Sequence, residues 1–305
     1  MRRVGSTTDS TTSSSATDVR SGFTIVRNAI KLDFPVVPAI RSVLELCDEV
    51  IVNVGRSDDG TRDLIASIGD PRVRILDTEW DFSLGSRMLA VETQRAMDAC
   101  RGSWGVYIQA DEVLHEHGAR TLADAIAACD GDSRVEGLAV RYLHFYGDFE
   151  TLATNRRWYR REVRAVRLHV GIRSHRDAQG FRVGAQARRV RARLTEAAVF
   201  HYGWARPAWA IEEKYEANKR IWTEGVDQIT RQQARGHLEW MPLLRPFRGT
   251  HPRVAQDWIA ERSHDPRRYV GPRRLRPRHL RYYVSDWIER LTGTRLFEFR
   301  NYDVV

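Results

Sequence analysis

The amino-acid sequence predicts an α/β fold, with a mostly parallel sheet covered by helices on both faces. From residue 22 onward, short apolar runs alternate with segments whose apolar residues recur at helical spacing. This alternation is typical of parallel strands joined by covering helices. Acidic residues follow two of the apolar runs directly, at Asp59 and Asp111. Because ligands of such sheets bind outside the carboxyl ends of the strands, we expect both acids at one crevice.

The first part of the chain supplies most of the alternating pattern. Strands are expected, in order, at residues 23–26, 49–54, 73–76 and 104–112. Helices are expected between and after them, at residues 36–47, 64–68, 86–100 and around 122–129. Asp33 precedes Pro35 and is expected to cap the first helix, since proline is tolerated in a first turn.

The pattern changes after residue 135. Apolar and polar residues alternate from Leu138 to Tyr142, and residues 158–166 and 181–194 read as arginine-rich strands. Such alternation favours half-exposed antiparallel strands that line an acceptor side of the site. An apolar strand at residues 199–204 follows, then a helix from Pro207, a loop rich in Pro and Arg, and a final helix at residues 278–291.

Three regions follow from these changes in composition. Residues 1–20 are rich in Ser and Thr and are expected to be disordered, because they carry too little apolar surface to offset ordering. Residues 21–205 form the expected main domain. Residues 206–305 form an expected helical extension with an Arg-rich loop.

Composition narrows the class of protein. The 305 residues contain no apolar run near the ~20 that a membrane span needs, and the beginning lacks a signal-peptide core, so we expect a cytoplasmic protein. The three cysteines, Cys47, Cys100 and Cys129, lack metal-ligand spacing and are expected to be small core residues. Oligomeric state stays open.

The formal charge of +9 favours anionic partners such as nucleotides, nucleic acid or acidic membrane surfaces. The basic residues are spread along the chain, and no nucleic-acid-binding module is evident, so nucleic acid is not the expected partner. Arginines are densest at residues 267–281. Two interpretations of that loop stay open: an anion-binding edge near lipid headgroups or acidic glycan, and a solvated loop without a specific role.

Residues 104–112 hold the main candidate for a site. The apolar run Val106, Tyr107 and Ile108 leads directly into Gln109, Ala110, Asp111 and Glu112. Burying a strand beside ionised carboxylates is costly unless they are paired or bind a metal ion. A site at this strand end is therefore expected.

The strand leading into Asn28, the loop at residues 57–61 and the acidic strand end at Asp111 together resemble family 2 glycosyltransferases with the GT-A fold. The resemblance covers residues 23–203. It implies a Rossmann-type sheet in which Asn28 and Asp59 contact the nucleotide, and in which Asp59 contacts the nucleobase. It also implies that Asp111 binds a Mn²⁺ or Mg²⁺ ion on the donor diphosphate. Gln109 stands where the family's first acid is usual, so Glu112 is the expected second carboxylate.

Further residues are assigned from the same resemblance. The run Trp158 to Glu162 is similar to the segment that precedes the family's acceptor loop. His201 resembles the late histidine that returns to the metal or diphosphate. Asp177 lies at the acceptor-loop position and is the expected base for the acceptor hydroxyl, with Glu162 as its rival. Arg87, at the start of a helix, is expected to donate to the phosphates.

The resemblance therefore implies an inverting, metal-dependent hexosyltransferase that uses a nucleoside diphosphate sugar and a glycan or lipid-linked acceptor. Contact with an anionic membrane surface is compatible with the arginine loop. Two alternatives stay open: a nucleic-acid or other anion-binding protein, and a sugar-nucleotide-binding protein without turnover.

Overall fold

Four neighbouring parallel strands form one half of the sheet. The computed structural model describes residues 19–221, 238–263, 270, 272–295 and 298–305, apart from the side chains of residues 218 and 220. The strands are β1 (Arg20–Val26), β2 (Glu49–Gly55), β3 (Val73–Thr78) and β4 (Trp104–Tyr107). Their order is β3-β2-β1-β4, and each neighbouring pair is parallel. Their carboxyl ends therefore meet at one edge, as expected for the loops at Asp59 and Asp111.

The sheet continues from β4 into an antiparallel half. There β8 (Arg161–Arg167) pairs antiparallel with both β4 and β6 (Gly137–Tyr146). The long β11 (Arg188–Trp204) runs parallel to β6 and antiparallel to β5 (Glu112–Leu114). A hairpin of β9 (Ile172–His175) and β10 (Gly180–Val183) completes the order. The predicted α/β class, with its antiparallel portion, is confirmed.

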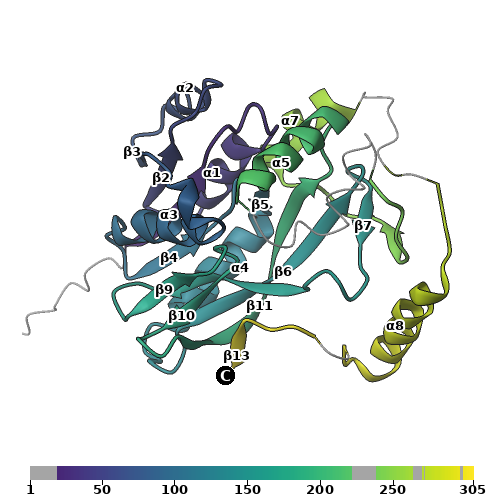
Figure 1. Ribbon diagram of the computed structural model, residues 1–305. Coiled ribbons are helices and arrows are strands. Elements are labelled where there is room, and N and C mark those ends of the chain that lie inside the picture. Colours follow the sequence, from purple (N-terminus) through teal and green to yellow (C-terminus); the bar gives the residue numbers. More distant parts are fainter. Residues whose placement is uncertain (1–18, 222–237, 264–269, 271, 296–297) are drawn as a thin grey trace, which may run out of the picture.

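Helices cover both faces of the parallel half (Figure 1). The first face packs against α1 (Val36–Leu44), α2 (Thr61–Ala66) and α4 (Glu116–Ala127), and the other against α3 (Arg87–Asp98). The alternation of β2 explains this arrangement, since Val50 and Val52 join the first core and Ile51 the second. Fully burying each such side chain contributes roughly 1.5–3 kcal/mol. All three cysteines are buried and free, as expected.

The beginning of α1 differs from the prediction. Pro35, and not Asp33, occupies the N-cap position. The Asp33 carboxylate is buried and accepts hydrogen bonds from the Arg262 guanidinium, with 2.6 Å between Arg262 Nη2 and Asp33 Oδ1. The expected cap was wrong because Asp33 has a charged partner 229 residues further along the chain.

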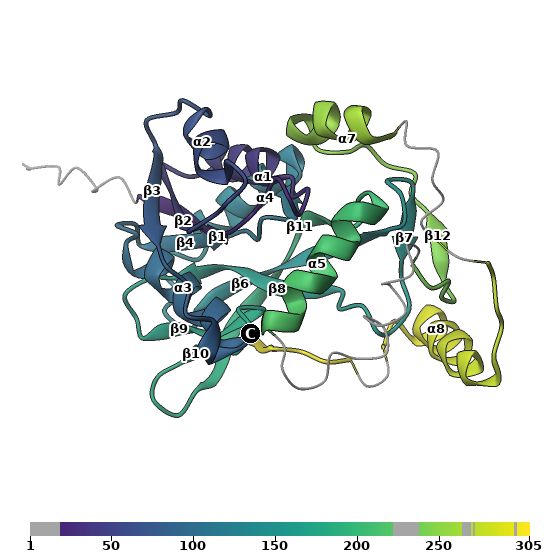
Figure 2. The same ribbon diagram turned by 45° about the horizontal axis from the view of Figure 1, so that its top comes forward.

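The segment after residue 205 contains strands as well as helices. Its helical elements are α5 (Ala208–Ile221), η2 (Arg253–Ala255), α7 (Gln256–Ser263), η3 (Pro277–His279) and α8 (Leu280–Thr292). Its strands return to the preceding region: β12 (Leu244–Pro246) pairs with β7 (Thr151–Ala153), and β13 (Tyr302–Val304) pairs with β11. In both ribbon views α8 stands apart from the sheet (Figures 1 and 2).

The N-terminal segment and the arginine loop at residues 267–281 are described only in part. Of the segment expected to be disordered, residues 1–18 lie outside the described residues, whereas Arg20 already begins β1. Arg267 and Arg268 of the arginine loop also lie outside the described residues. None of the helices that the structure describes combines the length and the apolarity needed to cross a bilayer.

Candidate functional site

Asp111 lies in the turn between β4 and β5, at the carboxyl edge of the parallel strands. Its side chain is buried beside the end of β11, and its carbonyl accepts a hydrogen bond from the Tyr202 amide at 2.9 Å. His201 Nε2 lies 3.5 Å from Asp111 Oδ2. A Cβ atom at residue 203 would lie within 2.6 Å of both groups, so Gly203 allows this close approach. The structure thus brings two predicted metal ligands, Asp111 and His201, together.

A second histidine, His144 on β6, orients His201. Its Nε2 lies 2.8 Å from the Tyr159 carbonyl oxygen, which only accepts, so Nε2 carries the proton. Burial, with His201 nearby, holds the pKa of His144 well below its usual value, so the ring is neutral. His144 Nδ1 must then accept from His201 Nδ1, 3.1 Å away. This leaves His201 Nε2 facing the Asp111 carboxylate, the arrangement of a histidine whose other nitrogen is fixed by an outer partner.

Two cations lie near the same carboxylate, Lys214 partly buried and Arg206 fully buried. Lys214 Nζ, from α5, lies 3.3 Å from Asp111 Oδ2, and Arg206 donates to the Gly203 carbonyl oxygen at 2.9 Å. Burial alone would raise the pKa of Asp111, but Lys214, His201 and Arg206 outweigh it and hold that pKa well below its usual value. Burial lowers the pKa of Lys214 to about 8. Asp111 is therefore an anion whose position suits a cation.

Glu112, the expected second carboxylate, is committed elsewhere. Both of its oxygens accept from the Arg164 guanidinium, at 2.8 and 2.9 Å, and both residues are fully buried. Tyr142 Oη donates to one oxygen at 2.7 Å, and the Gln109 backbone amide donates to the other at 3.1 Å. A metal ion would have to break this ion pair, so the geometry does not support the prediction that Glu112 is a ligand.

The donor set fits a metal ion that is shared with a ligand. Within the described residues, no group of three or more His, Cys, Asp or Glu side chains is placed to hold one. Asp111 and His201 would supply two ligands. Mg²⁺ in particular is usually held by one or two carboxylates together with substrate phosphates and water. The close approach at Gly203 and the fixed ring of His201 suit that arrangement.

The Gln109 side chain connects the strand end to the loop that carries Asp177. Its Nε2 atom lies 3.4 Å from both the Ala178 carbonyl oxygen and Tyr107 Oη. A carboxylate at this position could not donate to a carbonyl. Gln109 stands where the resembling family has an acid, and its bond to the Ala178 carbonyl gives a physical reason for an amide at this position.

The loops after β1 and β2 are tied to each other. Asn28 has a positive φ of 54°. Its side-chain oxygen accepts from the Asp58 backbone amide, and its backbone amide donates to Ser57 Oγ. Asp59 accepts from the Lys31 amide with one oxygen and from Thr61 with the other. The residues expected to bind the nucleotide thus lie in two loops that are hydrogen-bonded to each other. The Asp59 carboxylate is used in these bonds and holds the loops together.

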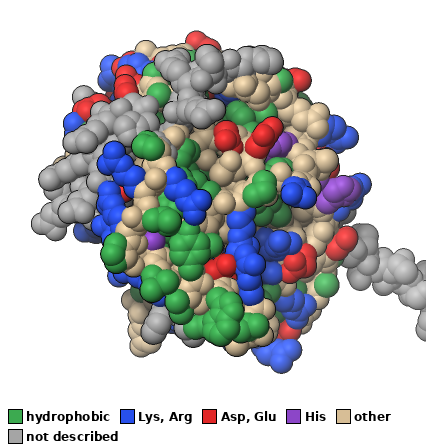
Figure 3. Space-filling view, turned by 90° about the vertical axis from the view of Figure 1, so that its right-hand side faces the viewer, with side chains coloured by type: hydrophobic (Ala, Val, Ile, Leu, Met, Phe, Trp, Pro, Cys, Tyr) green, Lys and Arg blue, Asp and Glu red, His purple; other side chains and the backbone are tan. Residues whose placement is uncertain are grey.

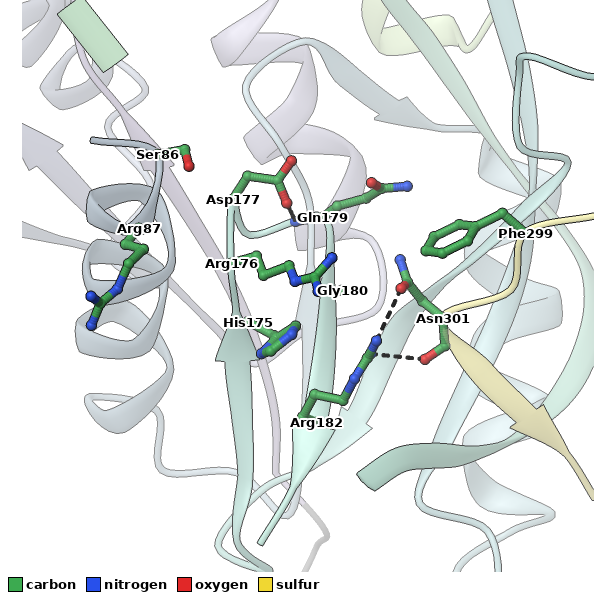
Figure 4. A pocket seen from close by; sticks show the side chains of 10 residues that line it. All are labelled: Ser86, Arg87, His175, Arg176, Asp177, Gln179, Gly180, Arg182, Phe299 and Asn301. Atoms are coloured by element: carbon green, nitrogen blue, oxygen red, sulfur yellow. Dashed lines mark hydrogen bonds between the residues drawn. The ribbon is translucent and has the colours of Figure 1, made fainter. Parts of the chain in front are cut away.

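Asp177 lines a cavity of about 290 Å³ between the β9–β10 hairpin and the beginning of α3 (Figure 4). Its neighbours Arg176 and Ala178 have positive φ values of 54° and 62°, which is unfavourable for residues other than glycine. Arg87, the expected phosphate contact, lines the same cavity. The structure therefore places Arg87 and Asp177 on the lining of one cavity.

Arginine dominates the charge of this cavity. Arg87, Arg176 and Arg182 line it together with His175, against the single carboxylate of Asp177. Arg182 donates to the Asn301 carbonyl oxygen at 3.0 Å, and the side chains of Arg87 and Arg176 have no ion pair within the described part of the chain. A second cavity, of about 330 Å³, shares Gln179 and Phe299 with the first. Trp158 and Tyr159, from the expected acceptor segment, line the second cavity.

Glu162, the rival base, lies beneath these cavities. It is fully buried and accepts from Gln179 Nε2 at 2.9 Å and from Asn301 Nδ2 at 3.3 Å. Burial raises the pKa of Glu162 to about 7. Among the described residues, Glu162 lines neither cavity but bonds to Gln179 and Asn301, which line the first one. This geometry favours a positioning role over that of the base.

Comparisons with known proteins give structural matches only. No family profile and no curated protein matches this sequence. Among solved structures, S. aureus TarS residues 1–349 align with a TM-score of 0.37 at 12% identity, covering 72% of this chain and 70% of that one. A second structure of S. aureus TarS aligns with a TM-score of 0.32 at 16% identity, covering 42% of this chain and 22% of that one.

A third match is glucosyl-3-phosphoglycerate synthase from Mycobacterium tuberculosis, solved with Mn²⁺, UDP and phosphoglyceric acid. It aligns at a TM-score of 0.30 and 16% identity, covering 42% of this chain and 44% of that one. The chain thus spans less than half of the length of most of these proteins. With scores below 0.5, they do not establish the function of this chain.

Sequence reasoning missed several residues of the site. His144, Arg164, Gln179, Lys214 and Asn301 all contact predicted residues. One of them carried a signal, because Arg164 lies between Val163 and Ala165 inside an apolar run and therefore needed a buried acid. The others come from elements distant in sequence, and no local pattern points to them.

Proposed function

We propose that this protein is a family 2 glycosyltransferase that moves a sugar from a nucleoside diphosphate to an acceptor hydroxyl, with inversion. The Asp111–His201 pair, beside the parallel strand ends, is the observation that supports this most. The loop of Asn28 and Asp59 lies at the same sheet edge and would hold the nucleotide. On the antiparallel side, the Asp177 cavity would take the acceptor.

Asp111 and His201 would hold a divalent ion, which when bound offsets the negative charge of the departing diphosphate. Lys214 occupies one side of Asp111 and would have to yield that side to the ion. Its ammonium would then be available to the phosphate oxygens. Arg206, buried against Gly203, would add a fixed positive charge.

In the transfer itself, the acceptor oxygen forms a bond to the anomeric carbon as the bond from that carbon to the diphosphate oxygen breaks. Asp177 would accept the proton of the acceptor hydroxyl, because it is the carboxylate that lines the cavity. Gln109 would hold the loop of Asp177 against the donor side through the Ala178 carbonyl.

The charge of the cavity favours an acceptor that carries a phosphate or carboxylate. Arg87, Arg176 and Arg182 outnumber the one acid, and guanidinium groups bind such anions through paired hydrogen bonds. An anionic group held there would bring a neighbouring hydroxyl toward Asp177.

Titration calorimetry with UDP and GDP, with and without Mn²⁺, tests the donor half of the proposal. We expect one nucleotide to bind more tightly with Mn²⁺, and Asp111→Ala to weaken that binding by roughly tenfold or more. Asp63→Ala, an exposed acid on α2, is the matched control. Absence of binding by either nucleotide would contradict the proposal. Donor hydrolysis by the wild type, lost in Asp111→Ala, would rule out a binding protein without turnover.

A further inference from the structure

The polarity of α8 is inverted relative to an ordinary surface helix. Its inward side buries Tyr282 and Ser285 and also carries ion pairs. Glu289 pairs with Arg160 at 2.8 Å and with Arg295 at 2.8 Å, and Asp286 pairs with Arg245. A helix normally turns its apolar stripe toward the core and its charges toward water. Here ion pairs attach the helix to the protein beside the buried Tyr282 and Ser285, and the larger apolar stripe is left outward.

The outward side carries a continuous apolar stripe. Leu280, Val284, Trp287 and Leu291 follow one another at spacings of four, three and four residues, which places them on one face. Their side chains are 67%, 47%, 63% and 65% exposed, respectively. Leu275, just before the helix, is 62% exposed. Contiguous apolar surface of this kind marks a site of interaction.

Arginines border the stripe. With about 3.6 residues per turn, Arg281 and Arg290 fall on its two sides. The acids Asp286 and Glu289 make the inward ion pairs, and Asp286 also pairs with Arg290 at 3.0 Å. In Figure 3, which faces the side of the molecule where α8 lies in Figure 1, hydrophobic side chains gather beside Lys and Arg side chains.

The segment before α8 adds to the positive charge. Arg273 and Arg274 have no acidic partner within the described residues, and Arg276 and Arg278 share the single carboxylate of Glu239. The whole surface, which we call the α8 face, therefore combines exposed apolar residues with arginines that outnumber their acidic partners: Arg290 pairs with Asp286 at 3.0 Å, whereas Arg281, like Arg273 and Arg274, has no ion pair within the described residues. Its members are Arg273, Arg274, Leu275, Arg276, Arg278, Leu280, Arg281, Val284, Trp287, Arg290 and Leu291.

We infer that the α8 face binds an anionic membrane surface, with α8 lying in the plane of the interface. Helices that do so bury an apolar side rich in Leu and Trp and place Lys or Arg at headgroup level. A symmetric contact between two copies fits poorly, because it would bring the arginines of both copies together. This inference does not depend on the proposed transferase activity.

Flotation with lipid vesicles tests the inference on the full chain. We expect binding to phosphatidylcholine vesicles that contain about 30% phosphatidylglycerol, and little binding to phosphatidylcholine alone. Replacing apolar members, in W287S/L291S, should weaken partitioning by roughly tenfold or more. The matched control V170S/L194S removes two apolar side chains that are 50% and 42% exposed elsewhere, and should bind as the wild type does.

A charge variant and the oligomeric state complete the test. Arg273→Gln with Arg274→Gln should lower binding to anionic vesicles and reduce its dependence on salt. Circular dichroism would verify that each variant is folded. Equal binding to both lipid compositions, or no binding, would overturn the inference. A dimer in light scattering that W287S/L291S abolishes would assign the α8 face to a second copy instead.

Discussion

Gln109 links the two halves of the candidate site through one side chain. Its amide reaches the carbonyl of Ala178, next to Asp177, whereas its backbone amide donates to Glu112 in the strand-end turn. An acid at this position would add a carboxylate at the strand end and lose the bond to the Asp177 loop. The residue type at position 109 therefore favours the fixed position of the Asp177 loop over a richer metal site.

Asp177→Asn tests the proposed base. The amide keeps the size of the side chain but cannot take a proton, so turnover should fall by roughly 10²- to 10⁴-fold while donor affinity is unchanged. Transfer rates at saturating donor, with calorimetry for the donor, provide the measurement. Asp63→Asn should leave both unchanged. A loss smaller than about tenfold would exclude Asp177 as the base.

Glu162 makes stability depend on pH. Burial raises its pKa from 4.5 to about 7, so between these pH values the folded protein binds more protons than the unfolded chain. Stability should therefore fall as pH rises through this window and level off above it, by ~3 kcal/mol in total. Urea unfolding at a series of pH values from about 5 to about 8 gives the free energy of unfolding at each pH, and hence this slope.

The variant Glu162→Gln removes the titrating group and should flatten the slope. The exposed Glu213→Gln on α5 should keep it. An unchanged slope in Glu162→Gln would show that other groups control this part of the pH profile.

At the scale of elements, the Glu112–Arg164 pair joins β5 to β8, two strands that do not pair with each other. The guanidinium also lies 5.1 Å from the ring centroids of both Tyr107 and Tyr142. The pair thus connects the strand that follows Asp111 to the antiparallel half of the sheet. Its burial makes each partner dependent on the other.

Arg164→Met should cost about 3–5 kcal/mol of unfolding free energy, because it leaves Glu112 buried without a counter-charge. The double variant E112Q/R164M removes both charges and should recover much of this loss. Urea unfolding of the three proteins gives the comparison. A single-variant loss below about 1 kcal/mol would mean that water or another group neutralises Glu112.

Across the whole molecule, sequence patterns were most informative where structure is local. Apolar periodicity predicted the strands of the parallel half and the helices on both faces, because each of those signals lies within a few residues. Asp111 was singled out because it follows an apolar strand, and His201 was assigned from the family resemblance; the structure places the two 3.5 Å apart. Glu112 was assigned to a metal since nothing near it in sequence reveals Arg164, and Lys214 was missed for the same reason. The sequence predicted the final helix at residues 278–291 but not the direction that its apolar residues face.

The return of the chain to the sheet at β13 affects the order in which the site is made. Phe299 and Asn301 precede β13, and both line the Asp177 cavity, where Asn301 also bonds to Glu162. On the ribosome these residues emerge after every other residue of the cavity. The proposed nucleotide-binding edge of β1 and β2 can thus fold early in synthesis, whereas the Asp177 cavity, the proposed acceptor site, is completed only when residue 301 is free to dock. A nascent chain would therefore acquire its donor half before it has an acceptor half.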